Sequence, residues 1–198
     1  MTALGLIFGI LPPRGTAAEA VPGELRLGAA RVTINAPPGI GLAGYYHERG
    51  NEGVLDDLTV RTLVLDDGRR VAALAVCDLI AMPRWLVEEA RTEIAARTPI
   101  PGAQVMIAAT HTHTAPVLRG DSTRENVAGS DPEISRAYGR TLPLRVAEAV
   151  AYVLGSREER MFPFQAVSEL MQRCGSDGDR AALLRRDCFS WAGGKACC

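Results

Sequence analysis

Hydrophobic and polar positions in the middle of the chain predict a β-hairpin. Residues 60–65 and 71–76 are apolar runs that contain β-branched side chains. Asp66, Asp67 and Gly68 lie between the two runs, and this combination is typical of a tight turn. The second run ends at Cys77 and Asp78.

The next segment predicts a helix followed by a buried strand. Leu86, Ala90 and Ile94 recur every four residues, which gives one apolar helix face, and Pro83 suits the first helical position. Residues 105–109 form a short, fully apolar run, as expected of a buried strand. Strand, helix and strand in this order predict a right-handed βαβ crossover with parallel strands.

A second helix is predicted from residue 131 onward. Asp131 is a natural N-cap and Pro132 suits the first turn. Pro143 lies inside the stretch and should kink or split it, while Gly155 is placed to end it. The fold class expected is therefore α/β, with a mixed sheet, a βαβ crossover and flanking helices.

Composition and charge exclude several classes of protein. The chain has 198 residues, 47% of them hydrophobic, which fits a single medium-sized domain with a real core. Its formal net charge of −1 offers no basic face for nucleic acid. No run approaches the roughly 20 apolar residues that a membrane-spanning helix needs.

Both ends of the chain differ from the middle. Residues 3–11 are apolar and are followed by two prolines and by Ala18-Glu19-Ala20, which resembles a cleavage site. Residues 1–20 therefore predict an export signal that lacks its basic segment. Such a signal predicts a secreted or periplasmic protein. An N-terminal strand or arm is the alternative. From 156 to 198 the periodicity weakens and four of the five cysteines gather, which predicts a non-native or frame-shifted tail.

The candidate chemistry lies in the only three histidines. His111 and His113 follow the apolar run 105–109 directly, where ligands bind outside the carboxyl ends of parallel strands. If the chain stays extended, both rings point to one side and can share a metal, although many such pairs are plain surface loops. Asp78 ends the neighbouring strand, where it can orient a ligand histidine, help to hold the metal, or cap the next segment. His47 lies in a glycine-bounded loop that could reach the site as a possible substrate loop, or could serve packing only.

At these residues the chain resembles a known family. Residues 108–116, Ala-Ala-Thr-His-Thr-His-Thr-Ala-Pro, look like the histidine signature of the neutral/alkaline non-lysosomal ceramidases. Blocks at 31–45, 61–65 and 76–79 resemble the segments that precede this signature in the same family. The resemblance covers residues 28–155, the N-terminal part of such an enzyme.

The resemblance implies a zinc-dependent amidohydrolase that cleaves the amide of N-acylsphingosine to sphingosine and fatty acid. His111 would bind zinc, and His113 would lie by the substrate and stabilise the reacting carbonyl. A metal-activated water would attack that carbonyl. The implied partner is a ceramide-like lipid, with no nucleic acid and at most peripheral membrane contact.

Departures from the family limit this expectation. Family members are much longer, and no histidine follows His113 here to complete a three-ligand catalytic zinc site. The fold is therefore expected to be incomplete relative to the family, and the chain alone weakly active or inactive. The alternatives are a metal hydrolase of another amide or ester, or a binding domain without catalysis.

Overall fold

The computed structural model describes residues 23–118, 131–155 and 160–175 of the chain. The predicted export signal at 1–20 and the last part of the tail, 176–198, lie outside the described residues. The elements in chain order are β1 (Arg26–Thr33), β2 (Thr59–Asp66), β3 (Val71–Cys77), α1 (Arg84–Arg97), the short 3₁₀ turn η1 (Gly102–Gln104), β4 (Val105–Ala109), α2 (Pro132–Gly155), β5 (Phe162–Pro163) and α4 (Phe164–Gly175).

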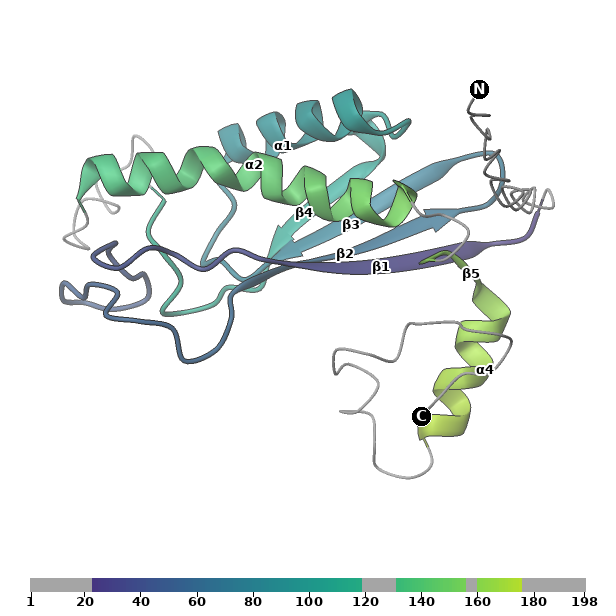
Figure 1. Cartoon of the computed structure of the whole chain (residues 1–198), viewed down its shortest axis with the longest axis horizontal. Coiled ribbons are helices and arrows are strands. Elements are labelled where there is room, and N and C mark those ends of the chain that lie inside the picture. The colour runs from purple at the N-terminus through teal and green to yellow at the C-terminus, as the bar shows by residue number, and fades with distance from the viewer. Residues whose placement is uncertain (1–22, 119–130, 156–159, 176–198) are drawn as a thin grey trace, which may run out of the picture.

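The strands form one mixed sheet in the order β4-β3-β2-β1-β5 (Figure 1). The strands β2 and β3 are antiparallel, and Asp67 closes their turn by donating its backbone N–H to the Arg70 carbonyl at 3.2 Å. The strands β3 and β4 are parallel and are joined through α1. The α/β class, the hairpin and the parallel crossover expected from the sequence are all confirmed.

Both long helices cover the same face of the sheet, and the core lies between them and the strands. Figure 1 shows α1 and α2 side by side on one side of the strands. The apolar face predicted for α1 is buried at Leu86, Ala90 and Ile94. In α2, Val146 and Val150 are fully buried against the same sheet face. Burial of this common apolar layer is the main stabilising contribution.

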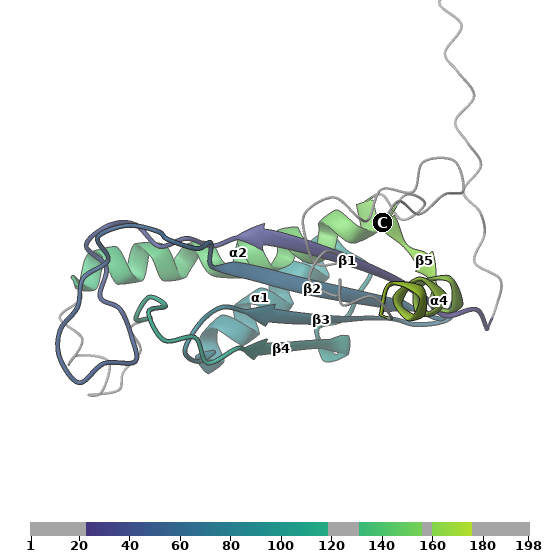
Figure 2. The same cartoon turned by 90° about the horizontal axis from the view of Figure 1, so that it is seen from below.

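The opposite face of the sheet is also apolar but lies outside this core. Register places Leu63 on β2 opposite Leu74 on β3, and Leu74 beside Met106 on β4. The two leucines are half-buried and Met106 is 63% exposed. Figure 1 and Figure 2 show that α4 lies on this side of the sheet, at the end where β5 is found.

Helix boundaries follow the predicted capping residues closely. The Asp131 carboxylate accepts the backbone N–H of Glu133 at 2.7 Å, so the predicted N-cap is confirmed. The helix α2 runs unbroken through Pro143 to Gly155, so the expectation of a split at the proline is wrong. Pro83 precedes the first residue of α1 as its N-cap instead of occupying the first helical position.

The segment after α2 returns to the sheet at β1. Phe162 pairs with Leu27, and the Met161 carbonyl accepts a hydrogen bond from Arg26 at 2.8 Å. Gly28 makes this approach possible, because a Cβ there would lie 2.5 Å from the Arg160 carbonyl oxygen. Residues 160–163 therefore pack with the preceding fold, while the domain boundary drawn at 155 stays a prediction.

Candidate functional site

His111 and His113 lie just after the carboxyl end of β4, as the sequence predicts. Because β3 runs parallel to β4, the ends of both strands meet at the same edge of the sheet. The rings of His111 and His113 pack edge to face, with centroids 5.5 Å apart. The chain does not stay extended, however, since His111 has a φ of 61° in the left-handed region. The pairing of the rings thus comes from a tight turn and not from strand alternation.

Hydrogen bonds to the end of β3 and to the segment that follows it hold His111 in this turn. The Thr110 and Thr112 N–H groups donate to the Cys77 and Leu79 carbonyls, each at 3.0 Å. Nδ1 of the His111 ring lies 2.9 Å from the Ile80 carbonyl oxygen. A protonated Nδ1 donating to this carbonyl leaves Nε2 as the nitrogen that can bind a metal, the usual arrangement of a ligand histidine.

His113 is positioned by the loop that contains Gly44. This loop pairs with the chain after the histidines, because Thr114 donates its N–H to the Ala43 carbonyl at 3.0 Å and the Ala43 N–H donates to Ala115 at 2.8 Å. Gly44 has a φ of 95°, and a Cβ on it would lie 2.5 Å from Cγ and Nδ1 of the His113 ring. Only glycine permits both the backbone conformation and the close approach.

Asp78 is a buried anchor and not a partner of either histidine. Its Oδ2 accepts from the Thr59 N–H at 3.0 Å and the Thr59 hydroxyl at 2.8 Å. Its Oδ1 accepts from the Arg61 guanidinium at 3.0 Å and the Thr110 hydroxyl at 3.3 Å. Both oxygens are used by β2 and by Thr110, and no hydrogen bond joins Asp78 to His111 or His113, so a supporting role of Asp78 toward a ligand histidine stays a prediction. The hydrogen-bond partner of the His111 ring is the Ile80 carbonyl.

The same network sets the ionisation of Asp78 and Cys77. Partial burial pushes the pKa of the Asp78 carboxyl upward, but the hydrogen bonds from Thr59 and the charge of Arg61 outweigh it and lower the pKa below its ordinary value. Burial, with a smaller effect of the Asp78 charge, raises the pKa of the Cys77 thiol to about 12. Asp78 is thus a stable carboxylate, while Cys77 is a protonated, buried core residue.

His47 belongs to the loop beside the site but does not join the other two histidines. The centroid of its exposed ring lies 5.8 Å from that of the Tyr45 ring. The Arg49 guanidinium stacks over the Tyr45 ring, 4.8 Å from its centroid. Gly44 of the same loop does touch His113, so the loop reaches the site through its backbone. A substrate role for His47 stays a prediction.

The donors present supply part of a zinc site. The imidazoles of His111 and His113 are suitable zinc ligands in chemistry and spacing. Across residues 23–118, 131–155 and 160–175, no group of three or more His, Cys, Asp or Glu side chains is placed to hold a metal ion. The described chain therefore fits zinc with up to two ligands, fewer than the three expected of a catalytic site.

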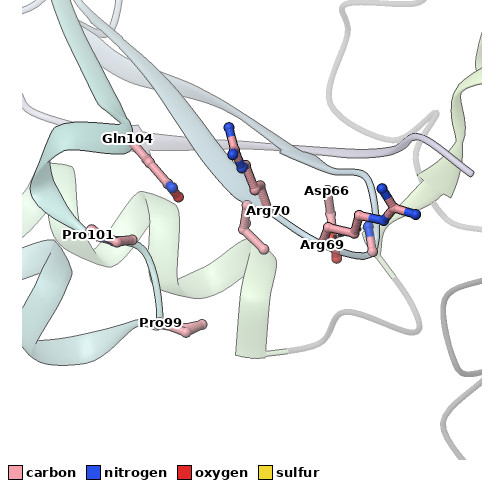
Figure 3. Close-up of a pocket in the computed structure, with 8 residues that line it drawn as sticks. Asp66, Arg69, Arg70, Pro99, Pro101 and Gln104 are labelled. Atoms are coloured by element: carbon pink, nitrogen blue, oxygen red, sulfur yellow. Dashed lines mark hydrogen bonds between the residues drawn. The ribbon is translucent and has the colours of Figure 1, made fainter. Parts of the chain in front are cut away.

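A hollow of about 430 Å³ lies at the other end of the sheet and does not include the histidines. Arg69, Arg70 and Gln104 line it together with prolines near η1 (Figure 3). It sits at the turn between β2 and β3 and at the start of β4, opposite the carboxyl ends where His111 follows. It belongs to the surface of the hairpin turn and not to the candidate site.

Several residues that shape the site escape sequence reasoning. Ile80 acts through its backbone carbonyl, so its side chain carries no signal. Thr59 precedes the hairpin run and resembles any polar residue at a strand start. Gly44 could have been suspected as a glycine next to two tyrosines in a polar loop, but its partner His113 lies far along the chain.

Comparisons with known proteins place this architecture beside a bacterial hydrolase. The neutral ceramidase from Pseudomonas aeruginosa matches with a TM-score of 0.56 and 21% identity, over 71% of this chain and 22% of that chain. A ceramidase complexed with C2 matches with a TM-score of 0.54, also at 21% identity and over the same shares of the two chains. The present chain thus spans about a fifth of the length of these ceramidases.

Other comparisons find no match, neither with a family profile nor with a curated protein. The similarity to the ceramidases is one of fold, over 71% of this chain. Among the residues that the structure describes, no helix combines the length and the apolarity needed to cross a bilayer.

Proposed function

We propose that this chain is the N-terminal part of a zinc-dependent amidohydrolase of the ceramidase type, which hydrolyses the amide of N-acylsphingosine. The observation that carries the proposal is the pair of histidine rings, 5.5 Å apart, at the carboxyl end of β4. The fold similarity to neutral ceramidase over 71% of this chain supports it independently of the histidines.

The described residues have separate roles in this proposal. His111 binds the metal through Nε2, because Nδ1 lies at the Ile80 carbonyl. His113, pressed against Gly44, stands beside the substrate and donates a hydrogen bond to the reacting carbonyl oxygen. Zinc, when bound, supplies water activation at neutral pH and polarisation of the amide.

The proposed partner follows from the same chemistry, and the proposed location follows from the export signal predicted at residues 1–20. The proposed substrate is a ceramide-like lipid amide, with at most peripheral membrane contact and no nucleic acid. The predicted export signal places the protein outside the cytoplasm, in the periplasm or the medium. Localisation of the full chain in a fractionated bacterial host tests this directly.

Zinc titration of the purified chain is the first test. We expect weak zinc binding, because this proposal assigns one ligand among the described residues, His111, and a catalytic site needs three. His111→Ala should abolish the binding, and His113→Ala, which removes the neighbouring imidazole, should weaken it less. His47→Ala is the matched histidine control, and it should leave zinc affinity unchanged. Zinc affinity that is equal in all three variants contradicts the proposed metal site.

Substrate class needs a separate measurement. N-acylsphingosine and simple N-acyl amides and esters are offered to the zinc-loaded chain, and release of fatty acid is measured. Weak hydrolysis that prefers N-acylsphingosine supports the proposal. Preference for another amide or ester identifies a related metal hydrolase, while zinc binding without any hydrolysis identifies a binding unit.

A further inference from the structure

The threonines of the histidine loop form a hydrogen-bonded chain that ends on Asp78. The hydroxyl oxygens of Thr110 and Thr112 lie 2.6 Å apart, and the Thr110 hydroxyl lies 3.3 Å from Oδ1 of Asp78. A carboxylate only accepts, so Thr110 donates to Asp78 and is left with lone pairs that accept the Thr112 hydroxyl. The Cys77 carbonyl, at 3.4 Å, is a second and longer acceptor for Thr110.

This chain of hydroxyls brackets His111. Thr110 and Thr112 precede and follow it, and they also donate their backbone N–H groups, to the carbonyls of Cys77 at the end of β3 and of Leu79 just after it. His111 itself has a φ of 61°, a conformation that a residue with a side chain keeps only when its surroundings hold it. The two threonines are the residues that supply this restraint on either side.

Asp78 is suited to be the fixed end of the chain. It is 8% exposed, and Thr59 and Arg61 of β2 occupy its remaining acceptor positions. Its backbone N–H also donates to the Thr59 carbonyl at 2.9 Å. The carboxylate therefore ties β2, the end of β3 and the histidine loop into one network.

We propose that Asp78 is a positioning residue that fixes the turn at His111 through the hydroxyls of Thr110 and Thr112. The consequence for zinc affinity rests on the proposed function, because it assumes that His111 binds the metal. The consequence for the conformation of the loop does not depend on any metal. Asp78 touches neither histidine ring, so it acts on them only through the threonines.

The test compares two substitutions at Thr110 in the full chain. Thr110→Val keeps the shape and removes the hydroxyl, and Thr110→Ser keeps the hydroxyl. Thr92→Val is the control, because the Thr92 hydroxyl bonds the Glu88 carbonyl on α1, far from the loop. Amide hydrogen exchange at Thr112 is measured without metal, and zinc affinity is measured by competition with a chelating dye.

Thr110→Val should speed exchange at the Thr112 amide and weaken zinc binding by about 10–100-fold, as loss of a residue supporting a metal ligand does. Thr110→Ser should restore both properties, and Thr92→Val should leave both unchanged. Asp78→Asn should act in the same direction as Thr110→Val, because its amide NH₂ faces a group that only donates in either orientation, the Thr59 N–H or the Arg61 guanidinium.

Two results would overturn the inference. One is Thr112 exchange in Thr110→Val equal to that in Thr92→Val, and the other is failure of Thr110→Ser to restore it. If Asp78→Asn does not fold, the valine and serine variants still decide the question. If the unmutated chain binds no zinc, the proposed function fails while the exchange measurement still tests the positioning role.

Discussion

Replacing Gly44 by alanine tests the contact that places His113. The new Cβ would lie 2.5 Å from Cγ and Nδ1 of the ring and 2.8 Å from its Cβ, all closer than side-chain carbons approach one another. The backbone φ of 95° adds a second penalty, because it is unfavourable for any residue with a Cβ. We therefore expect Gly44→Ala both to destabilise the fold and to displace His113 from His111.

The two penalties can be estimated separately. Left-handed backbone costs roughly 1–2 kcal/mol, partly offset by about 0.4–1 kcal/mol from the stiffer unfolded chain. Displacing the His113 ring, which the new Cβ would overlap, costs about 1–3 kcal/mol. The exposed loop can yield, so we take the lower part of this range and expect a total of about 2 kcal/mol. For a chain of this length that lowers the Tm by roughly 4–8 °C.

Two other glycines separate these contributions. Gly23 has a φ of 100° with nothing within 4 Å of a built Cβ, so Gly23→Ala reports the backbone penalty alone. Gly50 has neither a positive φ nor a neighbour within 4 Å of a built Cβ, so Gly50→Ala reports the change in stability that a glycine-to-alanine substitution causes without strain or overlap. Urea unfolding gives the free energies, and the imidazole NMR signals of the histidines report ring placement. If Gly44→Ala matches Gly23→Ala in stability and leaves the His113 signals unmoved, the contact does not position the ring.

Three more predictions concern stability and association. Folding lowers the pKa of Asp78 from its ordinary value of 3.8, so the Asp78 carboxylate stabilises the fold fully above pH 3.8 and loses this effect as the pH falls through the lowered pKa. The Tm of Asp78→Asn should therefore fall less on acidification than the Tm of the unmutated chain. Tyr138→Phe removes the buried hydrogen bond to the Ile34 carbonyl and should cost about 1–3 kcal/mol in urea unfolding, whereas an unchanged midpoint contradicts this. Met106 is 63% exposed on edge strand β4, so Met106→Lys should reduce self-association in light scattering and change stability by less than about 0.5 kcal/mol.

The parts of the fold that could be predicted from sequence depend on local signals. The hairpin follows from Asp66-Asp67-Gly68 between two apolar runs, and the start of α2 follows from Asp131 before Pro132. Strand β1 was not predicted, because its Gly28-Ala29-Ala30 centre has no clear alternation and its pairing with β2 spans a long loop. The two-residue strand β5 is shorter than any periodicity can detect.

The candidate site divides in the same way. The edge of the sheet where His111 and His113 emerge follows from the order of strand, helix and strand, so their placement could be predicted. The turn at His111 could not, because φ in the left-handed region is uncommon for a histidine and depends on carbonyls supplied by another strand. Chain order shows that Asp78 reaches this edge, but not that Thr59, Arg61 and Thr110 bond its oxygens.

The two histidines are also supported to different degrees, and this bears on what each can do. His111 is restrained by bonds on both sides and at Nδ1 to the last residue of β3 and the segment that follows it, so its position depends on the body of the sheet. His113 is located by the loop around Gly44, which pairs with the chain at Ala43 and Ala115 but is exposed at its tip. A firmly held imidazole suits a metal ligand, whose position must be set before binding. One that moves with a surface loop suits contact with a substrate that must enter and leave. This difference in support agrees with His111 as ligand and His113 as substrate contact, and it predicts faster amide exchange at Thr114 than at Thr112.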